Sequence, residues 1–312
     1  MEIARLEDLA ARGWPVPVVT AGNFDGVHRG HQALVAAAVQ DARACAGTAV
    51  VLTFEPHPSQ VLSPDRAPAS LVTLEQKAEL LAGLGVDKLA LLPFTRDLSQ
   101  KTPEEFARLV LREAIGAHVV VVGAGFRFGS GRSGDVATLS ALGAGLGFRV
   151  HALSPVLHQG APISSTRIRE ALARGAVTGA REMLGRSFYV DGKVVRGAGR
   201  GAALGFPTAN LAVLNETLPG GGVYACWCRR LQHAGSDRQP TVVNVGRRPT
   251  FGGREICVEA HLLDHEGDLY GQMLRLDFVE RLREERAFAG PEALAKQIGR
   301  DAAQARRVLE KA

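Results

Sequence analysis

The residues best suited to chemistry are two histidines near the N-terminus. Residues 18–31 read VVTAGNFDGVHRGH, so a β-rich run leads into a glycine-containing turn and then into His28 and His31 on either side of Gly30. Glycines permit a tight turn and a close approach of a ligand to the backbone. We expect a helix to begin near Gly30, where free N–H groups and the helix dipole favour a phosphate. Two imidazoles at this point predict a site that binds a polyphosphate through charge-assisted hydrogen bonds.

Two other interpretations of this histidine pair are weaker. Ordinary turn histidines would not explain why a strand, two glycines, an acid at Asp25 and a helix start occur together. A zinc site lacks a third ligand nearby. The cysteines match neither a zinc spacing nor a redox pair, and we interpret them as thiols of a protein in the reducing cytoplasm: Cys45, Cys226, Cys228 and Cys257.

A second group of candidate residues lies in a glycine-rich stretch that ends at Asn210. The chain contains no GxxxxGK[ST] loop, so a phosphate site in this stretch must hold its ligand in another way. Backbone N–H groups between glycines can wrap phosphates, although an ordinary glycine-rich loop of a barrel is the alternative. Thr208 and Asn210 lie on one side of an extended segment, and their oxygens suit Mg²⁺ bound to ATP phosphates. The glycines are Gly197, Gly199, Gly201 and Gly205.

Between these two groups, the segment ISSTRIR predicts the start of a helix. Ser164, Ser165 and Thr166 can cap it, with hydroxyl and N–H groups facing an anion. Arg169, in the first turn, can place a guanidinium on the same phosphate. Taken alone, this is the pattern of an ordinary helix cap beside a surface arginine. Together with the histidine pair it predicts the second half of a triphosphate clamp.

The first half of the chain predicts an α/β domain that positions these residues. β-rich runs alternate with helical stretches, which is typical of a doubly wound parallel sheet. Thr102, followed by Pro103 and two glutamates, marks one helix start clearly. We expect strands at Val18–Ala21, Ala49–Phe54, Val86–Leu92, Ala117–Val122 and Arg149–Leu153, and helices at 30–46, 73–84, 102–116 and 135–146.

The second half predicts a different architecture. Strands follow one another with Gly- and Pro-rich turns and no helices between them, which indicates a small antiparallel barrel or sandwich. Apolar residues at helical spacing after Pro291 predict a terminal helix on it. We therefore expect two domains, residues 1–184 and 185–312. The strands of the second are expected at Phe188–Val195, Val223–Arg230, Thr241–Val245, Ile256–Leu263 and Gln272–Val279.

These motifs, in this order, resemble those of one family. Residues 22–31 fit the GxFDGVHxGH pattern of HxGH nucleotidylyltransferases, and most closely that of the bacterial bifunctional riboflavin kinase/FMN adenylyltransferases, or FAD synthetases. TFEPHP at 53–58 and ISSTRIR at 163–169 match further motifs of that family's first domain. GFPTAN at 205–210 matches its flavokinase signature, and the resemblance covers essentially the whole chain.

The resemblance implies an enzyme with ATP as co-substrate and two activities: phosphorylation of riboflavin to FMN, and adenylylation of FMN to FAD with release of pyrophosphate. It implies that Glu259 accepts or orients the proton of the riboflavin 5′-hydroxyl. On periodicity alone, Glu259 is a solvent-facing residue of an edge strand. Adenylyl transfer needs no protein nucleophile, so His28 and His31 would act by positioning and charge stabilisation, with Mg²⁺.

Motifs and resemblance together predict the binding residues. His57 has an alternative interpretation as a turn residue between two prolines. We expect the flavin to contact His57, Phe128 and Arg283, and the metal to contact Thr208 and Asn210. The residues expected to contact the nucleotide are Gly22, Phe24, Asp25, Gly26, Gly30, Ser164, Ser165, Thr166, Arg169, Gly197, Gly199 and Gly205.

The chain departs from the family pattern at Gly125, where Asp or Asn is usual. A polar side chain that would touch substrate is therefore missing. Either the backbone and a water replace it, or adenylyl transfer is weakened.

Charge and hydropathy bear on partners and location. The net charge of +5 is spread without a Lys/Arg cluster, so we expect riboflavin, FMN and ATP as partners and no nucleic acid. Without a long apolar run or a signal sequence, we expect a cytoplasmic protein with no membrane association, and a homo-oligomer is compatible with the sequence.

Two rival functions stay open. Another nucleotidylyltransferase leaves GFPTAN unexplained, and a flavin- or nucleotide-sensing regulator predicts salt-sensitive binding of RNA or DNA without turnover.

Overall fold

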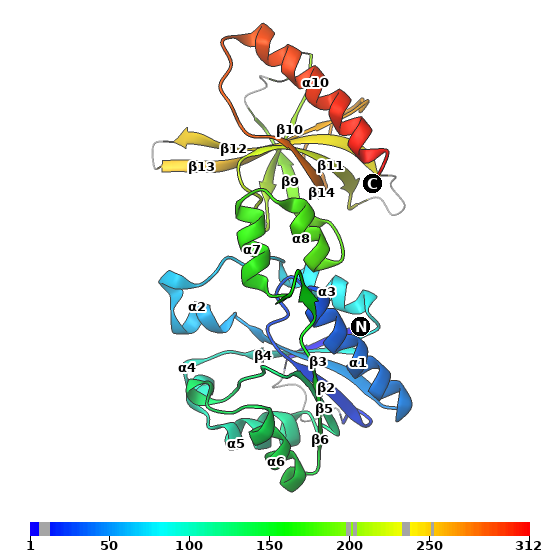
Figure 1. The fold of residues 1–312 in the computed structure, drawn as a ribbon, viewed down its shortest axis with the longest axis vertical. Helices are drawn as coiled ribbons and strands as arrows, with labels where there is room; N and C mark the ends of the chain where they lie inside the picture. Colours follow the sequence, from blue (N-terminus) through cyan, green and yellow to red (C-terminus); the bar gives the residue numbers. More distant parts are fainter. Residues whose placement is uncertain (6–12, 198–200, 202–204, 233–237, 251–252) are drawn as a thin grey trace. The chain divides into compact units, whose positions relative to one another are not determined.

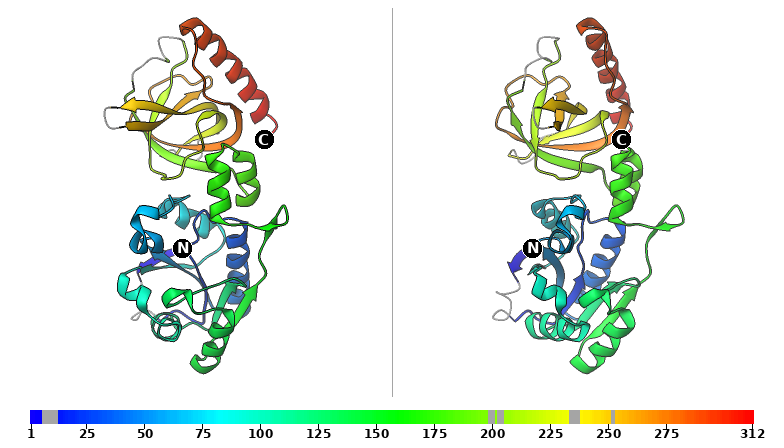
Figure 2. Two further views of the ribbon diagram at one scale, coloured as in Figure 1. Left: turned by 60° about the vertical axis from the view of Figure 1, so that its left-hand side comes forward. Right: turned by 90° about the vertical axis from the view of Figure 1, so that its left-hand side faces the viewer.

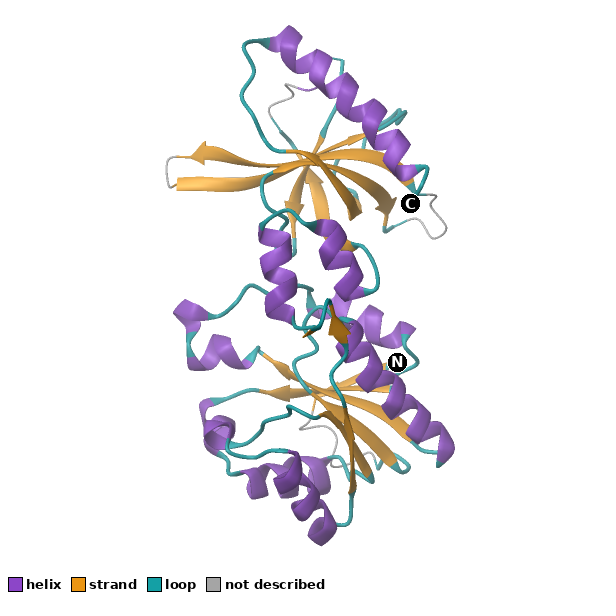
Figure 3. Cartoon of the chain, in the orientation of Figure 1, coloured by secondary structure: helices purple, strands orange, loops and turns teal. Residues whose placement is uncertain are grey.

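The computed structural model of the chain describes all residues except 6–12, 198–200, 202–204, 233–237 and 251–252. The described residues form two compact units, Met1–Ala69 with Leu74–Ser164, and Ser70–Thr73 with Ser165–Ala312. Both units combine helices with a sheet (Figure 3). Contacts group residues 165–184 with the second unit, and the domain boundary expected after residue 184 stays a prediction.

The first unit is built on a six-stranded sheet in the order β1-β4-β3-β2-β5-β6 (Figure 1). Every pairing in it is parallel, which confirms the expected doubly wound sheet. β2 is buried along its whole length, as expected for a parallel strand covered on both faces. The strands are β1 (Glu2–Arg5), β2 (Pro17–Ala21), β3 (Thr48–Glu55), β4 (Lys88–Pro93), β5 (Val119–Gly123) and β6 (Arg149–Leu153).

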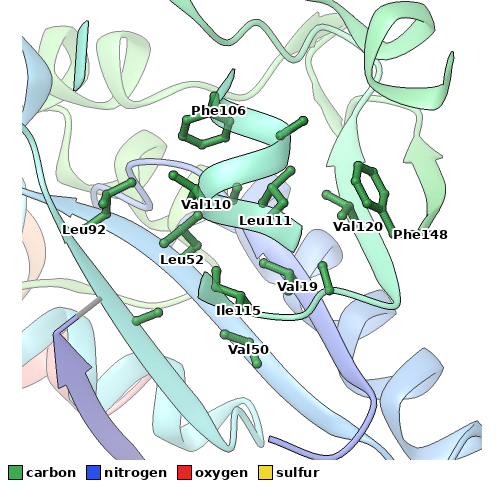
Figure 4. Close-up of a cluster of buried hydrophobic side chains, with 14 of the residues drawn as sticks. Val19, Val50, Leu52, Leu92, Phe106, Val110, Leu111, Ile115, Val120 and Phe148 are labelled. Carbon is green, nitrogen blue, oxygen red and sulfur yellow. The ribbon is translucent and has the colours of Figure 1, made fainter. Parts of the chain in front are cut away.

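Helices cover both faces of this sheet. One face carries α5 (Pro103–Phe106), its π-helical continuation η3 (Ala107–Ala114) and α6 (Val136–Leu146), which close the core drawn in Figure 4. The other face carries α1 (Arg29–Ala44) and α3 (Leu74–Gly83). Successive side chains of a strand point to opposite faces, so Val19 joins the first core and Val18 the second.

The helix expected at 102–116 is only partly as predicted. Its start is as expected, because the Thr102 hydroxyl accepts from the Glu105 N–H at 3.1 Å and the Glu105 carboxylate accepts from the Thr102 N–H at 2.8 Å. After one turn, however, it continues as the π-helix η3, which the apolar spacing does not signal. The shorter elements are α2 (Pro58–Leu62), η2 (Pro64–Arg66), α4 (Arg96–Gln100), η4 (Ser130–Arg132), and the hairpin of β7 (Leu157–His158) and β8 (Ala161–Pro162).

The second unit contains a closed antiparallel barrel in the order β10-β13-β12-β11-β14-β9. β10 pairs with both β13 and β9, and this closure selects the barrel over the sandwich. β10 was expected only as an extended segment. The strands are β9 (Phe188–Val195), β10 (Ala209–Val213), β11 (Gly222–Arg230), β12 (Gln239–Thr250), β13 (Gly253–Leu262) and β14 (Met273–Arg283).

The helices of this unit that lie in the described part of the chain include α7 (Ser165–Ala173), α8 (Val177–Leu184) and α10 (Pro291–Leu309). The expected terminal helix is α10, and it lies along the outside of the barrel (Figure 2). Ala305 and Leu309 of this helix pack in one cluster with Val223 and Val279. Within the described parts of the chain, no helix has the length and apolar character needed to cross a membrane.

Candidate functional site

The loop after β2 lies where the strand order of the first unit reverses. From β2 the chain moves outward through β3 and β4, and only later places β5 on the other side of β2. In open parallel sheets, ligands bind beyond the carboxyl ends of the strands at such a switch point. The topology therefore puts Gly22–His28 at the position where a nucleotide is expected.

The backbone of this loop is held in a strained conformation. Phe24 and Val27 have φ angles of 47° and 40°, in the left-handed region that non-glycine residues rarely adopt. Such residues cost on the order of 1–3 kcal/mol each and persist only where the surroundings enforce them. Both side chains are fully buried in one apolar cluster with Val35 and Leu81. Burial of these two side chains thus fixes the path of the loop.

His28 and His31 are brought together at the N-terminus of α1. His28 is the N-cap, and its Nδ1 accepts from the backbone N–H of His31 at 3.3 Å. The two rings stack with centroids 3.6 Å apart and planes 14° apart. A Cβ at Gly30 would lie 3.1 Å from His28 Cε1, so a side chain there would crowd the ring. The structure therefore stacks the two imidazoles, and Gly30 keeps the space beside His28 clear; their contact with phosphate stays a prediction.

The surroundings of His31 favour its neutral ring. Burial, the proximity of His28 and the charge of Lys77 hold the pKa of His31 well below its usual value. The buried Nδ1 of His31 has no hydrogen-bond partner among the described residues. Because Nδ1 of His28 accepts a hydrogen bond, neutral His28 carries its proton on Nε2. Neutral imidazoles at a helix N-terminus can donate hydrogen bonds to an anionic ligand.

His57 lies next to this loop. Its Nε2 is 3.0 Å from Asn23 Nδ2, and its Nδ1 accepts from the Ser59 N–H at 3.2 Å as the N-cap of α2. The Thr53 hydroxyl also binds the Asn23 carbonyl, at 3.2 Å. The second motif is thereby joined to the first through Asn23. A flavin contact by His57 stays a prediction.

The remaining predicted residues of adenylyl transfer are placed as follows. Asp25 is 5% exposed, and Phe128 is buried in the core between Phe106 and Gly134. Gly125 is exposed just beyond β5, and a Cβ built there meets no atom within 4 Å. Ser164 ends the first unit, whereas Ser165, Thr166 and Arg169 belong to the first turns of α7 in the second. Their roles stay predictions.

In the barrel, Glu259 lies in a row of polar residues across three strands. It is the register partner of Asn210 on β10 and of Asn244 on β12. Val258 and Ala260 on either side of it are buried, so all three polar side chains lie on the opposite face of the strands from the barrel interior. Glu259 is thus on an inner strand of the barrel, flanked on both sides by amides. The sequence did not indicate Asn244 as a site residue, because only strand pairing places it beside Glu259.

The segment carrying Thr208 and Asn210 is held against β13. His261 lies 2.8 Å through Nδ1 from the Pro207 carbonyl, and its ring contacts Phe206 edge to face. The carbonyl can only accept, so Nδ1 of His261 is the donor. His261 is therefore a positioning residue that the sequence did not single out for this role.

The glycines before this segment leave room for its polar groups. A Cβ at Gly197 would lie 2.0 Å from Asn210 Nδ2, and one at Gly201 would lie 3.0 Å from Thr208 Oγ1. Gly205 has a φ of 82°, in the region that glycine adopts without strain. The predicted nucleotide contact Gly199 lies outside the described residues.

A pocket of about 180 Å³ adjoins Thr208. Its wall combines Leu262, Leu269 and Tyr270 with the polar side chains of His265 and Asp268. Small-molecule sites usually combine apolar walls with a few polar groups that orient the ligand. Leu262 ends β13 and the others lie in the loop that follows it, and folding brings them beside Thr208.

The Arg283 side chain pairs with a carboxylate of the protein itself. It forms a paired interaction with Asp301 of α10, with Nε 3.0 Å and Nη2 2.8 Å from Oδ2. Asp301 is 2% exposed and also accepts from Gln297 at 2.8 Å. Glu285, two residues further, lies over β12, because a Cβ at Gly246 would be 2.5 Å from its Oε1. Arg283 thus ties the segment after β14 to α10, and its contact with flavin stays a prediction.

Two family models match the chain, one described as FAD synthetase over residues 13–167 and one described as riboflavin kinase over residues 184–309. A bifunctional riboflavin kinase/FMN adenylyltransferase of Escherichia coli strain K12 is 38% identical over 289 residues, 93% of this chain and 91% of that protein. The protein of the same description from Pseudomonas fluorescens is 40% identical over 292 residues, 93% and 92% of the two chains.

A solved structure described as a macrolide-efflux protein from Streptococcus pneumoniae is also similar. It is 30% identical, with a TM-score of 0.88, and the match covers 98% of this chain and 99% of that one. A shared fold does not by itself carry an activity from one protein to another.

Proposed function

Because the chain belongs to the family of bifunctional riboflavin kinase/FMN adenylyltransferases, we infer that each of its two units carries one ATP-dependent step. The chain phosphorylates riboflavin to FMN and adenylylates FMN to FAD. We propose that the first unit performs adenylyl transfer at His28 and His31, and that the second performs phosphoryl transfer at Glu259.

The proposed adenylyl transfer rests on positioning. A phosphate oxygen of FMN attacks the α-phosphorus of ATP, and pyrophosphate leaves. His28 and His31 are stacked at a helix N-terminus, which suits charge that develops on the phosphates. The lowered pKa of His31 favours its neutral ring, which can donate a hydrogen bond and need not lose a proton during the step.

The proposed phosphoryl transfer uses Glu259 as a base. The riboflavin 5′-hydroxyl attacks the γ-phosphorus of ATP, ADP leaves, and the hydroxyl proton passes to the carboxylate. Asn210 and Asn244 flank Glu259 in strand register and can orient both the carboxylate and the hydroxyl. The pocket beside Thr208 offers an apolar wall for the nucleotide base.

Hard oxygen donors in the second unit fit Mg²⁺. Thr208 and Asn210 present a hydroxyl and an amide, and the side-chain-free positions Gly197 and Gly201 leave space beside them. No group of three or more His, Cys, Asp or Glu suited to a metal occurs in the described part of the chain. We propose that Thr208 and Asn210 would hold a magnesium ion, which would neutralise charge on the ATP phosphates.

We further propose that the enzyme works in the cytoplasm on riboflavin, FMN and ATP, with no nucleic-acid or membrane partner. The four cysteines are all free thiols, which suits a reducing compartment.

The observation that carries the two-site proposal is that His28 and His31 lie in one unit and the row around Glu259 in the other. The test is chromatography of the products formed from riboflavin, ATP and Mg²⁺. We expect FMN to accumulate first and FAD to follow, and both to be lost when EDTA removes the metal. Bound flavin without product would support the sensor instead, and FMN without FAD would remove the activity proposed for the first unit.

Gly125 provides a separate prediction. Its exposed position has open space for a side chain, and its φ lies outside the left-handed region. We expect Gly125→Asn to raise kcat/KM for FAD formation about tenfold, since one hydrogen bond to a charged group contributes roughly 1.5 kcal/mol. Gly145→Asn is the matched control, because Gly145 is also exposed with open space. An unchanged or lower rate for Gly125→Asn would show that the backbone already fills this role.

A further inference from the structure

A buried lysine on α3 is not explained by the packing of the first unit. Lys77 is 8% exposed, and no hydrogen bond or ion pair to it is formed within the described residues of that unit. Buried lysines are rare unless they are paired, because an ammonium loses its hydration on burial. Lys88 on β4 shows the ordinary arrangement, since it is partly exposed and pairs with Glu2.

The packing of α3 places Lys77 against the histidine loop. Ala78 and Leu81 of the same helix lie in one apolar cluster with Phe24 and Val27. Lys77 and Leu81 are four residues apart and therefore share a helix face. The Phe24 ring is in turn 5.1 Å from the ring of His31. The helix face that carries Lys77 is thus turned toward the loop that holds the imidazole pair.

Charge links Lys77 to the same site. Burial lowers the pKa of Lys77, and the carboxylates of Asp25 and Glu55 offset this only in part. Lys77 also contributes to the lowered pKa of His31, because the positive charge of the lysine disfavours protonation of the nearby imidazole. A ligand anion at the imidazoles would supply the counter-charge that the fold itself provides only incompletely.

We propose that Lys77 is a phosphate-binding residue of the adenylyl-transfer site, where its ammonium pairs with a phosphate group bound at His28 and His31. The inference rests on the function proposed for that loop. The phosphate belongs either to ATP, whose outer two phosphates leave as pyrophosphate, or to FMN. In both cases a fixed positive charge stabilises a phosphate more strongly in a dry site than in water.

The test compares Lys77→Met with Lys88→Met. Methionine keeps much of the length of the lysine side chain and removes the charge. We expect Lys77→Met to lower kcat/KM for FAD formation from FMN by about 10- to 100-fold, the size of a lost charge-assisted hydrogen bond. Lys88→Met should stay within about twofold of the wild type, because its ion pair is on the surface.

Two binding measurements identify the phosphate. If Lys77 holds the ATP phosphates, inhibition by added pyrophosphate weakens in Lys77→Met while KM for FMN is unchanged. If it holds the FMN phosphate, KM for FMN rises and inhibition by pyrophosphate is unchanged. Either result supports the proposal, and a variant in which both constants keep their wild-type values overturns it.

Thermal unfolding separates this role from a structural one. Replacing an unpaired buried ammonium by an apolar side chain should leave the melting temperature of the full chain unchanged or raise it. Loss of FAD formation together with a lower melting temperature would instead assign Lys77 to structure and overturn the inference. His28→Asn, assayed alongside, distinguishes the two hypotheses. If neither His28→Asn nor Lys77→Met lowers FAD formation, the proposed histidine site itself is wrong. If it lowers FAD formation and Lys77→Met does not, only the inference about Lys77 fails.

Discussion

Replacing Glu259 by glutamine is expected to lower FMN formation from riboflavin by about 10²- to 10⁴-fold, the range of a lost general base. Glutamine keeps the size of the side chain and its place between Asn210 and Asn244, but it cannot take the hydroxyl proton. Adenylylation of supplied FMN should continue at the wild-type rate, because Glu259 lies in the second unit. Steady-state assays that start from riboflavin and from FMN measure the two steps separately.

Asp264→Asn is the matched control for this experiment. Asp264 is an exposed carboxylate just beyond the same strand and pairs with Arg306 at 2.7 Å. Its φ of 61° is tolerated by asparagine, so the change removes a charge without backbone strain. Both activities should persist in this variant. Equal loss of both steps in Glu259→Gln would contradict the division of labour between the units.

Removing either imidazole of the histidine pair is expected to lower FAD formation from FMN by about 10- to 150-fold, the effect of one hydrogen bond of roughly 1.5–3 kcal/mol to a charged phosphate. His28→Asn is preferable to alanine, because asparagine preserves an N-cap acceptor for α1 and so limits the loss of stability. His31→Ala removes the second ring. Riboflavin phosphorylation by the same proteins should be unchanged.

His151→Ala is the control for the histidine variants. His151 is a half-exposed histidine of the same unit that pairs with Asp41 on the surface, so its loss should affect neither activity. The pairing of His28 and His31 can be tested further with the double variant. Because the rings are stacked, the two losses should not be additive. FMN production that falls along with FAD formation would count against separate sites.

Most elements near the predicted sites follow from local patterns. Thr102 and Glu105 form the reciprocal cap that their spacing predicts, and α1 begins at Arg29, one residue from the expected start. In contrast, β1 has only one buried residue, Ala4, and joins the edge of the sheet without an alternating pattern. Such a strand forms because β4 offers unpaired backbone groups, which is a property of its neighbour.

The candidate sites show the same difference between features set by local sequence and features set by neighbouring elements. By itself the sequence determined the candidate residues for phosphate and metal binding, because the imidazole pair, the glycines and the Thr-x-Asn segment are each local and can be identified by type and spacing. The tertiary structure alone decided that Asn244 flanks Glu259, that His261 holds Pro207, and that Lys77 is buried over the histidine loop. These relations depend on strand register and helix packing between residues far apart in the chain, and contacts of this kind leave no periodicity in a single sequence.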